Sequence, residues 1–200
     1  FFGFGLIFLQ SCDFGKNSQE ELLLLEERAV RAIEMSDRKS ALLHLDTIVG
    51  IDRSYPMALR LMGESLIAIE KYDEAVSVLK ESILKNSGDL QDYIWLATAL
   101  ERSGNNEEAL DSLREGIDSL QDVPDVKNGL RYSPNEERLF LYTLNILNES
   151  EQMNLALMFA ERGFKRNSGS SELFKAWVDL LRLTGEREVE KSVKDEHCGR

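Results

Sequence analysis

Alanine residues recur in this sequence at an interval of 34 residues: Ala41, Ala75 and Ala109 follow one another at that step. Five further columns repeat at the same interval. One holds small residues and four hold mainly apolar ones: Ala29, Gly63 and Ala97; Ala32, Leu66 and Leu100; Leu45, Leu79 and Leu113; Val49, Ile83 and Ile117; and Leu25, Leu59 and Tyr93. This long period indicates a repeat architecture, because an ordinary helical bundle has apolar residues at i, i+3 and i+4 without it.

The same register continues after one longer step of 47 residues, which places Ala156 in the alanine column. The segment Lys85-Asn86-Ser87-Gly88 returns as Arg166-Asn167-Ser168-Gly169, one short step and one long step later. Leu144 stands in the small-residue column, so the packing of that repeat must differ. Glu190 stands where a fifth alanine would fall, which is typical of a polar terminal repeat. Two further sets of residues continue the columns of Tyr93, Ala97 and Leu100: Phe140, Leu144 and Leu147, then Phe174, Val178 and Leu181.

This period and these columns resemble the tetratricopeptide repeat (TPR) over about residues 22–185. The resemblance implies an all-α fold, an α-solenoid of about four to five helix-turn-helix repeats that forms a right-handed superhelix. Each repeat would pair a first helix, A, with an antiparallel second helix, B. The small residues would lie where A and B cross, because a larger side chain there overpacks at a cost of about 1–3 kcal/mol.

The repeat register divides the chain into seven segments, from an N-terminal leader to a polar tail. They are the end of an N-terminally truncated signal peptide with a lipobox (1–12), a polar tether (13–21), three repeats (22–123), an insertion loop with a helix cap (124–136), a fourth repeat (137–170), C-terminal TPR-like capping helices (171–195) and a tail (196–200).

The leader from Phe1 to Leu9 is apolar and uncharged. It is too short to span a bilayer, which takes about 20 residues, but it has the length of a signal-peptide core. The following Leu9-Gln10-Ser11-Cys12 resembles the lipobox of bacterial lipoproteins. That resemblance implies cleavage before Cys12 and acylation of its thiol with palmitate-type chains, which would anchor the protein to a bacterial envelope membrane on the periplasmic or surface side. The alternatives are an uncleaved signal anchor and an incidental cysteine.

Motifs for catalysis or cofactor binding are absent from the sequence, which has neither G-x-x-x-x-G-K-[ST] nor G-x-G-x-x-G. The two histidines, His44 and His197, lie at opposite ends, and Cys198 beside His197 lacks the further ligands of a zinc site. The net charge of −12 disfavours nucleic acid, since phosphate binding needs clustered Lys and Arg. We expect no enzymatic activity, no cofactor, no metal and no small-molecule substrate.

The insertion of 13 residues, about Gln121 to Ser133, precedes the fourth repeat. Lys127, Arg131 and Tyr132 give it a basic and aromatic character, which suits either a binding decoration or a tolerated longer connection. Ser133-Pro134-Asn135-Glu136 predicts a capping box and a helix start near Pro134.

Protein binding remains as the expected activity. In TPR proteins the A helices line a concave groove, and the mixture of charged and aliphatic residues at the corresponding positions fits a protein or peptide with an apolar stripe. It lacks the Lys, Arg and Asn ring with which some TPR domains clamp a C-terminal carboxylate. The groove positions are Arg60, Glu64 and Ile67; Gln91, Ile94, Thr98 and Glu101; Arg138, Leu141 and Asn145; and Lys175 and Asp179.

These features predict a non-enzymatic, lipid-anchored scaffold or adaptor outside the cytoplasm. Its architecture resembles that of TPR lipoproteins of outer-membrane assembly and pilus biogenesis. Two other functions stay open: a structural or self-associating component of an envelope complex, and a regulatory subunit of an envelope enzyme. Fold alone does not decide among the three.

Overall fold

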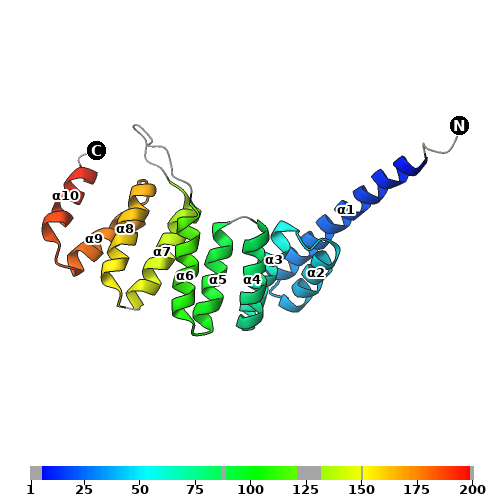
Figure 1. The fold of residues 1–200 in the computed structure, drawn as a ribbon, viewed down its shortest axis with the longest axis horizontal. Helices are drawn as coiled ribbons and strands as arrows, with labels where there is room; N and C mark the ends of the chain where they lie inside the picture. The colour runs from blue at the N-terminus through cyan, green and yellow to red at the C-terminus, as the bar shows by residue number, and fades with distance from the viewer. Residues whose placement is uncertain (1–5, 87–88, 121–131, 150, 199–200) are drawn as a thin grey trace. The chain divides into compact units, whose positions relative to one another are not determined.

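The computed structural model describes residues 6–86, 89–120, 132–149 and 151–198 (Figure 1). Within these ranges the chain forms ten α-helices and no strand, which confirms the predicted all-α fold. The helices belong to two compact units, Phe1–Ser87 and Gly88–Arg200.

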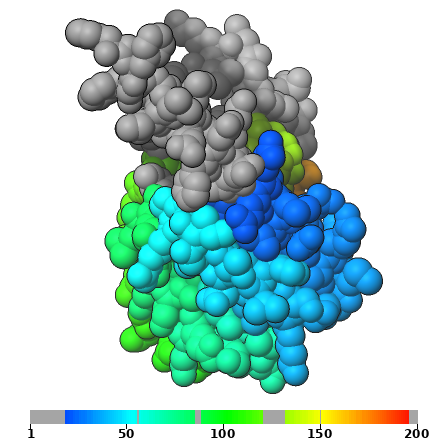
Figure 2. All heavy atoms as spheres, turned by 90° about the vertical axis from the view of Figure 1, so that its right-hand side faces the viewer, coloured from blue at the N-terminus to red at the C-terminus, as the bar shows by residue number. Residues whose placement is uncertain are grey.

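The first compact unit holds two helix pairs. They are α1 (Leu6–Glu34) with α2 (Arg38–Ile51), and α3 (Pro56–Ala68) with α4 (Tyr72–Asn86); α2 also packs on α3. In the space-filling view, the blue and cyan atoms of this unit form one continuous body (Figure 2). Because α1 is a single helix from Leu6, residues 13–21 of the predicted tether are helical.

The second compact unit holds three helix pairs, and α7 packs on both α5 and α9. The first helices of the pairs therefore form a layer of their own, in the order α5, α7, α9. The pairs are α5 (Leu90–Arg102) with α6 (Asn106–Asp118), α7 (Pro134–Glu149) with α8 (Met153–Arg166), and α9 (Ser171–Leu183) with α10 (Arg187–Cys198).

The alanine column lies at the centre of the helix pairs, as the repeat register predicts. Ala41, Ala75, Ala109 and Ala156 each open a B helix, and each is 0% exposed. The small-residue column on helix A is equally constrained: a Cβ atom on Gly63 would lie 2.5 Å from Leu79 Cγ of the paired helix. A larger side chain at any of these four alanines or at Gly63 would therefore displace its neighbours.

Two glycines on B helices mark a further close contact that the sequence columns do not reveal. A Cβ atom on Gly116 would lie 2.9 Å from Tyr93 Cγ, and one on Gly163 would lie 2.8 Å from Phe140 Cγ. The two glycines are 47 residues apart and so occupy the same column, as do the two aromatic residues. The ring on helix A and the glycine on helix B are therefore two halves of one contact.

Every turn between helix A and helix B has a left-handed residue at the same repeat position. Three of the five are not glycine, although only glycine takes this conformation without steric cost. In each turn the N–H of the residue directly after the left-handed one donates to a carbonyl at the same repeat position in helix A, for example Asn105 N–H to the Leu100 carbonyl at 2.8 Å. The five residues are Ser36, Glu70, Gly104, Glu151 and Gly185, with φ between 56° and 84°.

Replacing Gly163 by alanine should destabilise the fold, although alanine is normally the better helix former by about 1 kcal/mol. The new Cβ would enter the contact with Phe140, which is fully buried and has no room to retreat. Overpacking of this kind costs about 1–3 kcal/mol. We expect a net loss of about 1 kcal/mol in the free energy of unfolding, measured by urea titration.

Gly50→Ala is the matched control, because Gly50 is exposed in α2 and has no atom within 4 Å of the added Cβ. This variant should gain about 0.5–1 kcal/mol from helix propensity. Equal stabilisation of both variants would contradict the proposed contact between ring and glycine.

Replacing Glu70 by glycine should stabilise the fold by about 0.5–1 kcal/mol. The left-handed backbone at Glu70, φ 63°, costs a residue with a Cβ about 1–2 kcal/mol, and the entropy lost by glycine offsets only part of that gain. The control is Glu115→Gly on the exposed side of α6, which should lose about 1 kcal/mol. Thermal and urea unfolding would measure both, and destabilisation by Glu70→Gly would contradict a steric cost of the Cβ at this turn position.

Candidate binding face on the A helices

The twelve predicted groove residues are divided between the two compact units. Arg60, Glu64 and Ile67 lie half-buried on α3 in the first unit, and the other nine lie on α5, α7 and α9 in the second. Glu64 Oε1 lies 3.8 Å from Arg38 Nη1, and that nitrogen has no hydrogen-bond partner among the described residues. Glu64 therefore forms an electrostatic pair with the start of α2.

Side chains from α7 bond across to α5, so this part of the A-helix face is already occupied. Arg138 Nη1 donates to Gln91 Oε1 at 3.1 Å. The Tyr142 hydroxyl donates to Glu101 Oε2. Burial raises the pKa of Tyr142, and the hydrogen bond to Glu101 raises it further, so the hydroxyl remains a donor well above neutral pH.

Two of the predicted positions on α5 contribute little to the surface: one side chain is buried, and the hydroxyl of the other is hydrogen-bonded within the helix. Ile94 is 6% exposed and belongs to the core of the second unit. The Thr98 hydroxyl donates to the Ile94 carbonyl at 2.8 Å. Ile94 therefore offers no open surface to a partner, and the half-buried Thr98 already uses its hydroxyl proton within α5.

An open groove of about 270 Å³ lies between α7 and α9. Leu144 and Leu180 form its floor, since each is 7% exposed, and Leu183 lies at its edge with 70% exposure. Three of the predicted residues meet here: Leu141, Asn145 and Asp179. The full lining is Leu141, Leu144, Asn145, Asn148, Ala176, Asp179, Leu180 and Leu183.

The groove exists because a small residue stands at a position where the neighbouring repeat has a tyrosine. Ala176 on α9 lies 34 residues after Tyr142 and so holds the equivalent place. On α7 the tyrosine reaches back to Glu101 of α5. On α9 the alanine cannot reach back to α7, which leaves the space between the two helices open.

Five of the lining residues were not among the predicted groove positions, although the sequence carries a recognisable signal for them. Leu141 with Leu144, and Leu180 with Leu183, are pairs at i and i+3, which lie on one side of a helix. Leu144 was noted only as an exception in the small-residue column, and it supplies the floor of the groove.

Charged side chains of α9 and α10 form an ion-pair network beside the groove. Arg182 Nη1 donates to Asp179 Oδ1 at 3.2 Å, and Arg182 Nη2 donates to Glu190 Oε1 at 3.0 Å. A hydrogen bond from Lys194, followed by the one from Arg182, lowers the pKa of Glu190. The glutamate that replaces a fifth alanine is thus held in an ion-pair network at the end of the array.

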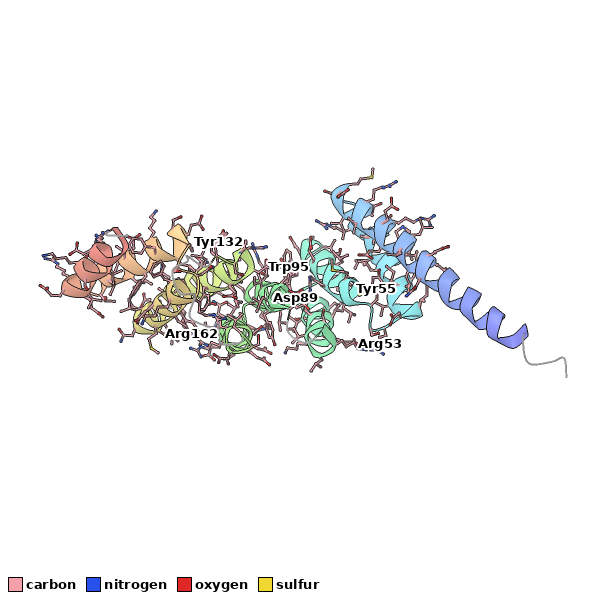
Figure 3. The ribbon with its side chains drawn as sticks, turned by 90° about the horizontal axis from the view of Figure 1, so that it is seen from above. Arg53, Tyr55, Asp89, Trp95, Tyr132 and Arg162 are labelled. Atoms are coloured by element: carbon pink, nitrogen blue, oxygen red, sulfur yellow. The ribbon has the colours of Figure 1, made fainter. Side chains whose placement is uncertain are left out.

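The last residues of the insertion, Tyr132 and Ser133, form hydrogen bonds to α7 and to the turn between α8 and α9. Tyr132, labelled in Figure 3, donates from its hydroxyl to Glu137 Oε2 at 2.8 Å, and the Ser170 hydroxyl donates to Glu137 Oε1. Asn167 is 0% exposed and bonds to both backbone groups of Ser133: it accepts from the N–H at 2.7 Å and donates to the carbonyl at 2.9 Å.

The predicted start of α7 at Pro134 is confirmed, but the predicted capping box is wrong in one respect. The N–H of Ser133 bonds to Asn167, while Glu136 Oε2 lies 3.4 Å from Arg166 Nε. The Ser133 N–H is thus satisfied by the buried amide of Asn167 and not by the Glu136 carboxylate, which pairs with Arg166. Lys127 and Arg131 lie outside the described residues.

The proposed lipidation site and the tail cysteine cannot be described at the level of side chains. Cys12, His197 and Cys198 have side chains outside the described part of the structure. Among the described residues, none of the helices is long and apolar enough to cross a membrane. No group of three or more His, Cys, Asp or Glu side chains in the described ranges is placed to hold a metal ion.

The paired helices, the buried alanine column and the repeated turn define an all-α, TPR-like solenoid. Solved structures of similar fold include MamA, with a TM-score of 0.63 and 12% identity over 90% of this chain and 91% of that one. Pseudomonas aeruginosa PilF has a TM-score of 0.64 and 15% identity over 92% and 78%. YrrB, described as a TPR protein with an unusual peptide-binding site, has a TM-score of 0.55 and 16% identity over 84% and 80%. No protein-family model and no curated protein matches the sequence.

Proposed function

We propose that this chain is a non-enzymatic scaffold or adaptor that binds a protein or peptide through the groove between α7 and α9. The open leucine-lined groove is the observation that carries the proposal. A partner at α5 and α7 would have to displace the bonds of Arg138 and Tyr142, whereas one at α7 and α9 gains apolar contact directly. The peptide-binding site in the description of YrrB, a protein of similar fold, supports the same class of ligand.

We propose further that acyl chains on Cys12 anchor the protein to a bacterial envelope membrane, on the periplasmic or surface side. The apolar leader directly before Leu9-Gln10-Ser11-Cys12 supports this assignment. Each buried methylene contributes about 0.8 kcal/mol, so two or more chains hold a protein stably. A chain of net charge −12 gains no such attachment from anionic headgroups, which attract basic segments.

A photo-crosslinking amino acid at Leu183 should capture a discrete partner in intact membranes, because this side chain is exposed at the groove edge. The same amino acid at Met158 of α8, 66% exposed and outside the groove lining, is the control and should give no matching adduct. Identical adducts from both sites would count against the groove. An adduct of two copies of this chain would favour the self-associating alternative, and an adduct with an envelope enzyme the regulatory one.

Metabolic labelling with a palmitate analogue should mark the wild-type protein and leave Cys12→Ala unlabelled. The thiol of Cys12 is the only acceptor that the lipobox resemblance supplies. Cys198→Ala is the matched control and should be labelled like the wild type. Labelling of the Cys12→Ala protein would contradict the lipid anchor and would not affect the proposed binding at the groove.

A further inference from the structure

We propose that the groove between α7 and α9 selects a peptide segment in which an aliphatic side chain neighbours a lysine or arginine. This inference rests on the proposed function and adds the chemistry of the partner to it.

The size of the groove determines what enters it. Its volume of about 270 Å³ lies below the range of about 300–1,000 Å³ for pockets that enclose whole small ligands. Leu144 and Leu180 on the floor and Leu141 and Leu183 on the walls offer an apolar seat from both helices. An aliphatic side chain of a partner therefore fits, and its burial removes apolar surface of both molecules from water.

The charge of the lining favours a cation beside that side chain. Asp179 is the one charged residue among the described residues that line the groove. Its ion pair with Arg182 is about half exposed, and Arg182 is shared with Glu190, so the pair holds Asp179 only weakly. Asn148 and Leu183 lie in the last turns of α7 and α9, where helix carbonyls add partial negative charge.

Two amides on α7 can orient the main chain of the bound segment. Asn145 and Asn148 are three residues apart on α7, both line the groove, and therefore lie on one side of that helix. Asn145 Nδ2 donates to Glu149 Oε1 at 3.2 Å, which holds the amide in place. An asparagine amide both donates to and accepts from a peptide group, so the pair suits a peptide backbone running along α7.

A random heptapeptide display library, panned against the full chain in detergent micelles, tests the inference. The expected enrichment is for an aliphatic residue within two positions of lysine or arginine. A fluorescein-labelled peptide of the leading sequence then gives dissociation constants by fluorescence anisotropy. Asp179→Asn should raise the dissociation constant about threefold, and the difference should shrink with added salt.

Ala176→Tyr is the variant that closes the groove, and it should raise the dissociation constant at least tenfold. The neighbouring repeat already carries Tyr142 at this place, so the fold accommodates the residue type. Asp111→Asn is the matched charge control, because Asp111 pairs with Arg114 at 3.3 Å and i, i+3, as Asp179 does with Arg182. Asp111→Asn should bind like the wild type.

The outcomes separate the inference from the proposed function. Enrichment of acidic peptides would overturn the partner chemistry but would still support binding at the groove. The same conclusion would follow if Asp179→Asn bound like the wild type while Ala176→Tyr did not. Failure of the library to enrich any sequence, or wild-type binding by Ala176→Tyr, would overturn both.

Discussion

The close crossing of helix A and helix B is the contact on which every repeat of this chain depends. Alanines of one column are 0% exposed at the start of the B helices, and Gly63 has Leu79 within 2.5 Å of where a Cβ would lie. At these positions the approach leaves no space for larger side chains, so a small residue on one helix faces a bulkier one on the other. Tyr93 with Gly116 and Phe140 with Gly163 show the same rule with the bulk placed on helix A.

The turns between the paired helices share one backbone geometry in all five pairs. A left-handed residue at one position lets the chain reverse within a few residues, and the same backbone hydrogen bond closes every such turn. Glu70 keeps this conformation despite the steric cost of a Cβ, because buried columns on both sides determine where α3 ends and α4 begins. The turn geometry is therefore imposed by the packing of the helices as much as by the residue in it.

Much of the fold was predictable from the sequence because its main constraint is periodic. Ala41, Ala75 and Ala109 predict the helix pairs, and Pro134 predicts where α7 begins. The bond between Asn167 and Ser133 was not predictable, since it joins residues 34 positions apart through side-chain and backbone groups. Ile94 was expected on the groove face and is buried instead, because a periodic position says which side of α5 it occupies but not how closely neighbouring helices cover it.

The difference between the two halves of the A-helix face comes from departures from the repeat. Tyr142 spans from α7 to α5 and closes that junction, whereas Ala176 at the same place on α9 leaves the next junction open. Leu144 then replaces the small residue of its column and supplies an apolar floor. A strictly periodic array would offer the same surface at every junction and could not direct a partner to one of them. Regular positions thus build the solenoid, and the irregular ones open the groove between α7 and α9.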